Sequence, residues 1–191
     1  MLDQLNINLF LLLNSLANKS AWFDSLAVIV AEYLPLVFIA VLVYFWFSNK
    51  ANYRNNALYA GYAAILGLAM NLLITLIYFH PRPFMDNLGR VLINHVPETS
   101  FPSDHTTLML SISITLMLLP NTRKLAIPLT LSGIVGGLAR VLCGIHYPFD
   151  ILGSLIVAMV AGLIVVSLKS RLAGINRYVM VTYARIVNEK A

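Results

Sequence analysis

The segment Pro81-Arg82-Pro83 places one arginine between two prolines. Proline fixes its own φ angle and restricts the residue before it, so the backbone on both sides of Arg82 is stiff. A planar guanidinium held in this way can make two charge-assisted hydrogen bonds to one phosphate group. We therefore expect Arg82 to bind phosphate. An interfacial anchor at the exit of a helix is the simpler alternative.

A second group of polar residues begins an apolar run, in the string Phe-Pro-Ser-Asp-His-Thr-Thr at 101–107. Ser103 is expected to cap a helix N-terminus, with Asp104 in the first turn. Backbone N–H groups at such a terminus can bind an anion. Ordinary capping explains Ser103 and Asp104 but gives no reason for His105 at this position. These three residues are therefore candidates for a phosphate site.

A third group surrounds a short polar connection and consists of Arg140, His146 and Asp150. Pro148 suits the first position of the helix that follows, so Asp150 falls in the first turn and can reach back to His146. A carboxylate on one imidazole nitrogen fixes the tautomer and leaves the other nitrogen free to act as a nucleophile or base. A His–Asp pair alone is more often structural, but the arginine nearby favours a catalytic role.

The elements that must position these groups are apolar helices. The chain has 191 residues, of which 59% are hydrophobic and 11% charged, which is too apolar for a soluble core and excludes a disordered chain. Cys143 is the single cysteine of the sequence, which excludes a disulfide scaffold. Crossing a membrane takes about 20 apolar residues in a helix. We predict an all-α polytopic membrane bundle, one domain over residues 1–191, with five spanning helices at 24–47, 55–79, 106–122, 125–139 and 151–168.

The two ends of the chain are predicted to lie at the membrane surfaces. Leucines recur at helical spacing within residues 1–19, among several asparagines, which favours an interfacial amphipathic helix over a span. Most of the 13 Lys and Arg residues fall on one side of the five-helix arrangement, including a basic tail at 170–191. The positive-inside rule makes that side cytoplasmic. The net charge of +5 is therefore a topology signal and does not indicate a nucleic-acid partner.

Together the three polar groups resemble the motifs of the type-2 phosphatidic acid phosphatase superfamily of lipid phosphatases. The first motif of that family ends in Arg-Pro, as Arg82-Pro83 does, and its Pro-Ser-Gly-His motif is matched by Pro-Ser-Asp-His at 102–105. Its Ser-Arg-x5-His-x3-Asp motif is matched, with the same spacing, by Ala139-Arg140, His146 and Asp150. The resemblance covers roughly residues 55–170.

Three positions depart from the family motifs. Thr75 stands where the family has a lysine, Asp104 replaces a glycine and Ala139 replaces a serine. One phosphate ligand is thus missing, and Asp104 adds negative charge beside an anion site. Thr75 and Asn71 are expected instead to hydrogen-bond between helices. The string Phe-Pro-Ser-Asp-His-Thr with Arg-Pro-Phe upstream resembles the bacitracin-resistance branch, whose members are undecaprenyl diphosphate phosphatases of the bacterial inner membrane.

The resemblance implies hydrolysis of undecaprenyl diphosphate at the external, periplasmic face of the inner membrane. His146 would attack the terminal phosphorus while Asp150 orients its ring, and His105 would protonate the leaving group and later activate water. The phosphate would be held by Arg82, Arg140 and the backbone near Ser103 and Asp104. No cofactor or metal is implied. The expected partners are the lipid substrate and the bilayer, and the oligomeric state stays open.

Three alternatives remain at this point. A phosphotransferase that passes the phosphate to another lipid would use the same residues. A transport component, for example one exporting bacitracin, would use Glu32 inside the first span as a coupling group, although a polar partner near the external surface is the simpler expectation for Glu32. A metal site built from the four histidines lacks a recognised ligand spacing and would contain two arginines that repel a cation.

Overall fold

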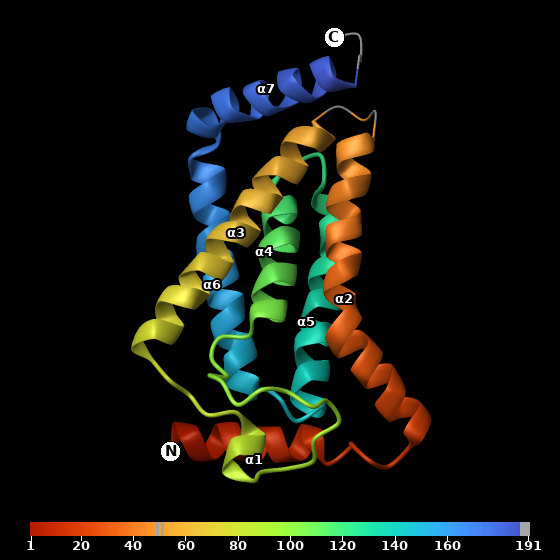
Figure 1. Cartoon of the computed structure of the whole chain (residues 1–191), viewed down its shortest axis with the longest axis vertical. Helices are drawn as coiled ribbons and strands as arrows, with labels where there is room; N and C mark the ends of the chain where they lie inside the picture. Colours follow the sequence, from red (N-terminus) through yellow and green to blue (C-terminus); the bar gives the residue numbers. More distant parts are fainter. Residues whose placement is uncertain (49, 51, 188–191) are drawn as a thin grey trace.

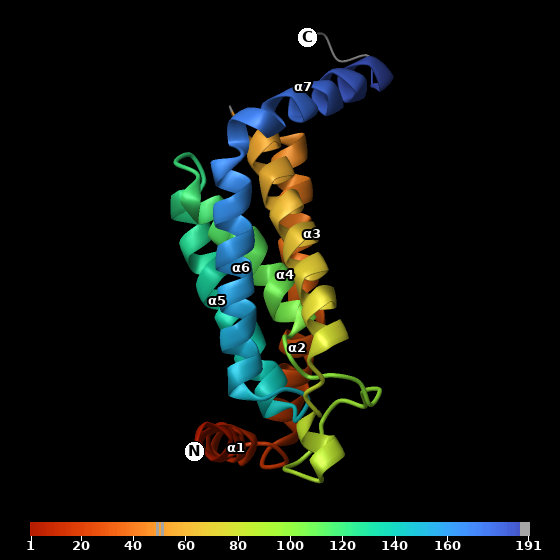
Figure 2. The same ribbon diagram turned by 90° about the vertical axis from the view of Figure 1, so that its left-hand side faces the viewer.

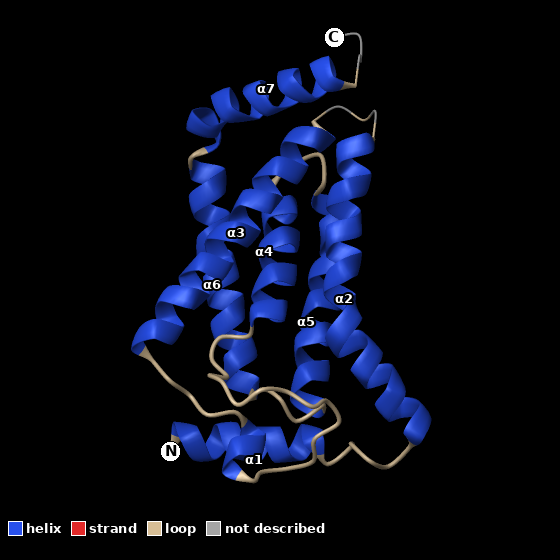
Figure 3. Ribbon diagram, viewed as in Figure 1, coloured by secondary structure: helices blue, strands red, loops and turns tan. Residues whose placement is uncertain are grey.

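The computed structural model describes residues 1–48, 50 and 52–187, and every regular element within these ranges is a helix (Figures 1 and 3). The expected all-α class is therefore confirmed. The elements are α1 (Leu2–Asn14), α2 (Ala21–Phe47), α3 (Tyr53–Ile77), the 3₁₀ helix η1 (Pro83–Asp86), α4 (Asp104–Leu118), α5 (Arg123–Leu142), α6 (Pro148–Ser167) and α7 (Lys169–Ile186).

Helices α2 to α6 run along the long axis of the molecule, and α4 lies in their middle, packed against α3, α5 and α6 (Figures 1 and 2). Between residues 106 and 116 all side chains of α4 except Leu108 are buried. Gly67 of α3 permits one close approach, because a Cβ atom there would lie only 2.6 Å from Ser111 Oγ of α4. The bundle is thus built around α4.

Four of the helices, α2, α3, α5 and α6, are long and apolar enough to cross a membrane. Helix α4 has 15 residues, or about 22 Å at 1.5 Å per residue, less than the ~30 Å of hydrocarbon. It ends before the expected Thr122 because Leu119 precedes Pro120, and a residue before proline disfavours the helical conformation; Leu119 has φ −98 and ψ 125. The count of five spans therefore stays a prediction.

Helix α1 forms where a helix was expected, but its faces are used differently. The buried residues are Asn6, Phe10 and Asn14, which recur every four positions and face the bundle. The regularly spaced leucines are mostly exposed on the other faces, for example Leu2 and Leu12. The stripe that contacts the bundle therefore combines two asparagines with Phe10, and most of the leucines face away from the protein.

Helices α1 and α7 lie across opposite ends of the bundle (Figures 1 and 2). Of the expected tail at 170–191, most residues belong to α7, and 188–191 lie outside the described residues. The α7 end also carries basic residues at the starts of α3 and α5, whereas the α1 end carries the connections 78–103 and 143–147. The expected charge difference between the two ends is present, and which end is cytoplasmic stays a prediction.

Candidate active site

The three sequence motifs meet at the α1 end of the bundle. A cavity of about 320 Å³ lies there, bounded by α3, α4, α5 and the connection 78–103. Five of the seven residues expected at the site are on its wall, while Ser103 and Asp150 stand behind it. The five are Arg82, Asp104, His105, Arg140 and His146.

Arg82 is 4% exposed, and the connection after α3 carries it into the cavity wall. Its Nη1 donates a 2.8 Å hydrogen bond to the Ile145 carbonyl and lies 3.3 Å from His146 Nε2. Its Nη2 donates to Glu98 Oε1 at 3.0 Å. Because the Glu98 side chain is about half exposed, a bound phosphate could take its place on the guanidinium.

Arg140 is 1% exposed and lies in the last turn of α5, which runs beyond the expected end of that span. Its Nη1 donates to the Ala31 carbonyl at 3.0 Å and to Glu32 Oε1 at 3.3 Å. Both acceptors belong to α2, so this helix orients the second guanidinium. The expected polar partner of Glu32 is thus Arg140.

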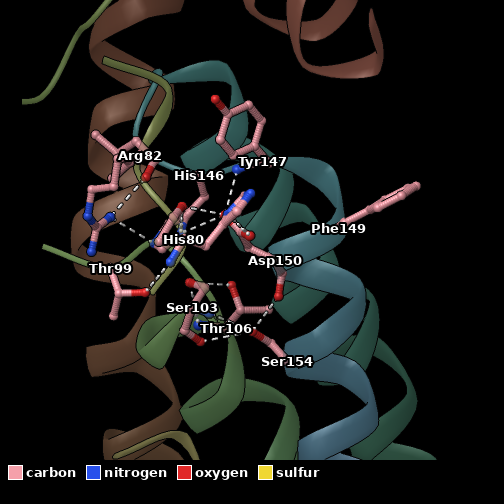
Figure 4. A network of polar contacts seen from close by, with 12 residues as sticks. His80, Arg82, Thr99, Ser103, Thr106, His146, Tyr147, Phe149, Asp150 and Ser154 are labelled. Atoms are coloured by element: carbon pink, nitrogen blue, oxygen red, sulfur yellow. Dashed lines mark hydrogen bonds and ion pairs between the residues drawn. The ribbon is translucent and has the colours of Figure 1, made fainter. Parts of the chain in front are cut away.

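His146 is held by the start of α6, as the spacing predicts. Pro148 occupies the first position of the helix, and Asp150 Oδ2 accepts from the Tyr147 backbone N–H at 2.7 Å. His146 Nδ1 lies 3.4 Å from Asp150 Oδ2 and 3.3 Å from Ser100 Oγ, and Ser100 also donates to Asp150 (Figure 4). With its Nδ1–H directed there, the Nε2 lone pair of His146 faces the cavity.

The protonation state of His146 suits a nucleophile. The ring is 2% exposed, and burial lowers its pKa from 6.5 to about 4. The imidazole is therefore neutral at neutral pH, with an unprotonated Nε2 that lies next to Arg82 Nη1. Gly144 contributes through its backbone: its φ of +84 turns the chain back directly after α5, so that His146 reaches the cavity.

The three residues at the start of α4 separate into different roles. Ser103 is the N-cap: its Oγ accepts from the Thr106 N–H, and its own N–H donates to Ser154 Oγ at 2.9 Å. The structure does not bring Ser103 to the cavity wall. Asp104 and His105 are on the wall, and Asp104 Oδ1 accepts from Asn71 Nδ2 at 2.8 Å. Asn71 is therefore the interhelical hydrogen-bonder that we expected.

Several features of the site were not expected from the sequence. Ser100 carries no signal beyond its place near the second motif, since its contact with Asp150 depends on tertiary packing. His80 lies with Nδ1 3.5 Å from Asp150 Oδ1. The prediction for Thr75 was wrong, because its hydroxyl donates to the Leu72 carbonyl of its own helix. In the part of the chain that the structure describes, no three His, Cys, Asp or Glu side chains form a group that could hold a metal.

Known proteins resemble this chain over most of its length. The PAP2 superfamily matches residues 56–173. The chain is 37% identical over 185 residues to undecaprenyl-diphosphatase BcrC of Bacillus subtilis (strain 168), with 97% of this chain and 95% of the relative covered. It is 27% identical over 177 residues to the bacitracin transport permease protein BcrC of Bacillus licheniformis, with 92% and 86% covered. The crystal structure of Aquifex aeolicus LpxE has the same fold, with a TM-score of 0.72 at 22% identity over 85% of this chain and 95% of that one. Because the matched region runs from α3 into α7 and includes all three motifs around the cavity, this chain belongs to the PAP2 superfamily.

Proposed function

We propose that this protein hydrolyses undecaprenyl diphosphate to undecaprenyl phosphate and inorganic phosphate, which returns a cell-wall lipid carrier to its monophosphate form. The observation that carries the proposal is the setting of His146, whose Nδ1 faces Asp150 while its Nε2 lies 3.3 Å from Arg82 Nη1. A histidine nucleophile next to a phosphate-binding cation suits phosphoryl transfer. The name of the B. subtilis relative supports a lipid diphosphate as substrate.

The first chemical step transfers the terminal phosphoryl group to the protein. His146 Nε2 attacks the terminal phosphorus, the bond from phosphorus to the bridging oxygen breaks, and a phosphohistidine forms. His105 gives a proton to the leaving undecaprenyl phosphate. Arg82 and Arg140, together with the Asp104 backbone N–H at the start of α4, stabilise the charge on the phosphoryl oxygens. The Asp150 carboxylate offsets the positive charge that develops on the imidazole.

The second step releases the phosphate. His105, now neutral, accepts a proton from a water molecule as the water attacks the phosphohistidine. The phosphorus–nitrogen bond breaks, inorganic phosphate leaves, and His146 regains its lone pair. As the family resemblance implies, no step in this scheme requires a metal ion.

The proposal includes a placement in the bacterial inner membrane. Helix α4 is the fifth crossing, surrounded by the four longer ones. The exposed leucine face of α1 lies in the interface at the external surface, and the basic α7 end is cytoplasmic. A lipid diphosphate of the external leaflet then reaches the cavity with its tail in the bilayer.

The test is phosphate release from undecaprenyl diphosphate by the detergent-purified full chain in EDTA. Wild type should release phosphate, and His146→Ala should lose about 10³-fold or more, since it lacks the nucleophile. Arg171→Ala, an exposed change in α7 at the opposite end, is the matched control and should keep full activity. A silent wild type would refute the proposed substrate, and loss caused by EDTA alone would refute the metal-free scheme.

Two alternatives make different predictions in the same system. A phosphotransferase would release little phosphate until an acceptor such as lipid A is added, and would then label that lipid. A transport component, which the name of the B. licheniformis relative suggests, would confer bacitracin resistance with or without His146. In the proposed mechanism, His146→Ala removes the resistance.

A further inference from the structure

His80 is fixed at the start of the connection that follows α3. Its N–H donates to Thr99 Oγ1 at 3.1 Å, and its carbonyl accepts from the Ser100 N–H at 2.7 Å. Its ring lies parallel to that of Tyr78, with centroids 6.1 Å apart, and is tilted against Tyr147 at 5.1 Å. Two backbone hydrogen bonds and two aromatic neighbours thus leave the imidazole little freedom.

The fixed ring faces the carboxylate that orients His146. His80 Nδ1 lies 3.5 Å from Asp150 Oδ1, while the three contacts with Ser100, Tyr147 and His146 all go to Oδ2 (Figure 4). Among the described residues, neither His80 Nδ1 nor Asp150 Oδ1 has a hydrogen-bond partner other than this contact with each other. Two imidazoles therefore stand at the two oxygens of one carboxylate. His80 itself is not on the cavity wall, so it does not touch the phosphate.

The charged groups facing His80 favour its protonated form. Asp150 belongs to α6, Asp86 to η1 and Asp3 to α1, and Asp86 Oδ2 also accepts from the Tyr147 hydroxyl at 3.3 Å. The interaction with Asp150 raises the pKa of His80 above 6.5, outweighs the opposing effect of burial, and is assisted by the other two carboxylates. The side chain is 26% exposed, so the ring can exchange protons with water.

We propose that His80 is a positioning residue whose protonation switches the strength of His146 as a nucleophile. Neutral His80 directs an Nδ1–H to Asp150 Oδ1 and leaves the carboxylate its full negative charge. The imidazolium form neutralises Asp150, so the carboxylate no longer raises the basicity of His146 or offsets the charge of the phosphohistidine. The proton comes from and returns to solvent. The inference rests on the phosphatase activity proposed above, which supplies the reaction that His80 modulates.

The test compares kcat/KM of His80→Gln with that of wild type across pH. Glutamine keeps a hydrogen-bond donor but does not titrate. Taking the ratio of variant to wild type cancels the ionisation of the substrate and of the other groups that the two proteins share. One pH unit below its pKa about a tenth of His80 remains neutral, so the ratio should be constant at pH values well above that pKa and about tenfold higher one pH unit below it. A ratio that does not change with pH would overturn the inference, because a purely structural role lowers activity equally at every pH.

A second variant and a measurement without turnover complete the design. His80→Phe keeps a ring between the two tyrosines but has no hydrogen-bond donor. The ratio of its kcat/KM to that of wild type should show the same pH-dependent rise from a lower starting value. This variant replaces His80→Gln in the comparison if His80→Gln fails to fold. In wild type, NMR of labelled histidine should show the His80 ring titrating above pH 6.5. A ring that stays neutral at about pH 5.5 would refute the switch. A wild type that releases no phosphate but shows this titration would refute the proposed function only.

Discussion

Asn14 joins α1 to the end of α5, close to the loop that carries His146. Its Nδ2 donates to the Leu142 carbonyl at 2.8 Å and to the Arg90 carbonyl at 2.7 Å, and its Oδ1 accepts from the Arg90 N–H at 2.6 Å. Asn14→Ala removes all three hydrogen bonds. The buried Leu142 carbonyl would cost about 1–3 kcal/mol when left unpaired, and each partly buried Arg90 group about 0.5–1.5 kcal/mol.

Together these losses amount to roughly 2–6 kcal/mol of unfolding free energy. For a chain of this size each kcal/mol shifts Tm by about 2–4 °C, so we expect Tm to fall by about 4–24 °C. The assay is thermal unfolding in detergent, with kcat/KM measured on the folded fraction. Because Leu142 stands four residues before His146, kcat/KM should fall as well.

The matched control for Asn14→Ala is on the same helix. Asn8 is exposed and hydrogen-bonds only locally, accepting from Gln4 Nε2 at 2.9 Å. Asn8→Ala should leave Tm and kcat/KM close to wild type. Asn14→Asp keeps the acceptor for the Arg90 N–H but turns a buried carboxylate oxygen toward the Arg90 and Leu142 carbonyls, so its Tm should fall at least as far as that of Asn14→Ala. Equal Tm and kcat/KM for Asn14→Ala and Asn8→Ala would refute the idea that Asn14 of α1 holds the loop that carries His146.

Three further outcomes follow from the contacts at the cavity. Glu98→Gln removes the carboxylate that competes for Arg82, so KM in phosphate-release kinetics should fall a few-fold with kcat nearly unchanged; a higher KM would contradict this. Ser100→Ala deprives Asp150 of a donor and should lower kcat about tenfold, together with the yield of trapped phosphohistidine. In Arg82→Lys, one ammonium cannot reproduce the planar contacts to Ile145 and the phosphate, and kcat/KM should fall about 10²-fold; activity near wild type would exclude a bidentate role.

The sequence predicted the parts of this molecule that depend on local pattern. Apolar runs with few or no charged residues predicted the four long apolar helices. The four-residue spacing between His146 and Asp150, with Pro148 at the start of the helix, predicted the contact between these two side chains. In both cases the partners lie within one helix or one turn. The prolines flanking Arg82 predicted its phosphate-binding role, whereas the same role for Arg140 came from the resemblance to a family. The two arginines are far apart in sequence but share the cavity wall.

What the sequence did not predict depends on contacts between distant segments. The leucine spacing of α1 predicted a helix, but the contact of Asn6 with the Phe149 N–H, 143 positions away, is seen only in the folded chain. The same holds for His80 and Ser100, whose contacts with Asp150 join the connection 78–103 to the start of α6. The residue types alone did not predict whether these side chains face the protein or the solvent, because an asparagine, serine or histidine near a membrane surface is compatible with either.

The shortness of α4 explains why an apolar bundle can hold a polar cavity. Helix α3 has 25 residues and α4 has 15, a difference of about 15 Å of helix at 1.5 Å per residue. Figure 1 shows the first turn of α4 set back from the ends of α5 and α6. The space beyond this first turn, toward α1, is filled by the connection 78–103, which brings Arg82, and by the end of α5, which brings Arg140. Extending α4 by one turn would therefore place its backbone in the cavity, where the proposed mechanism puts the phosphate. The helix that is shorter than a typical span is thus the one whose length leaves room for the proposed reaction.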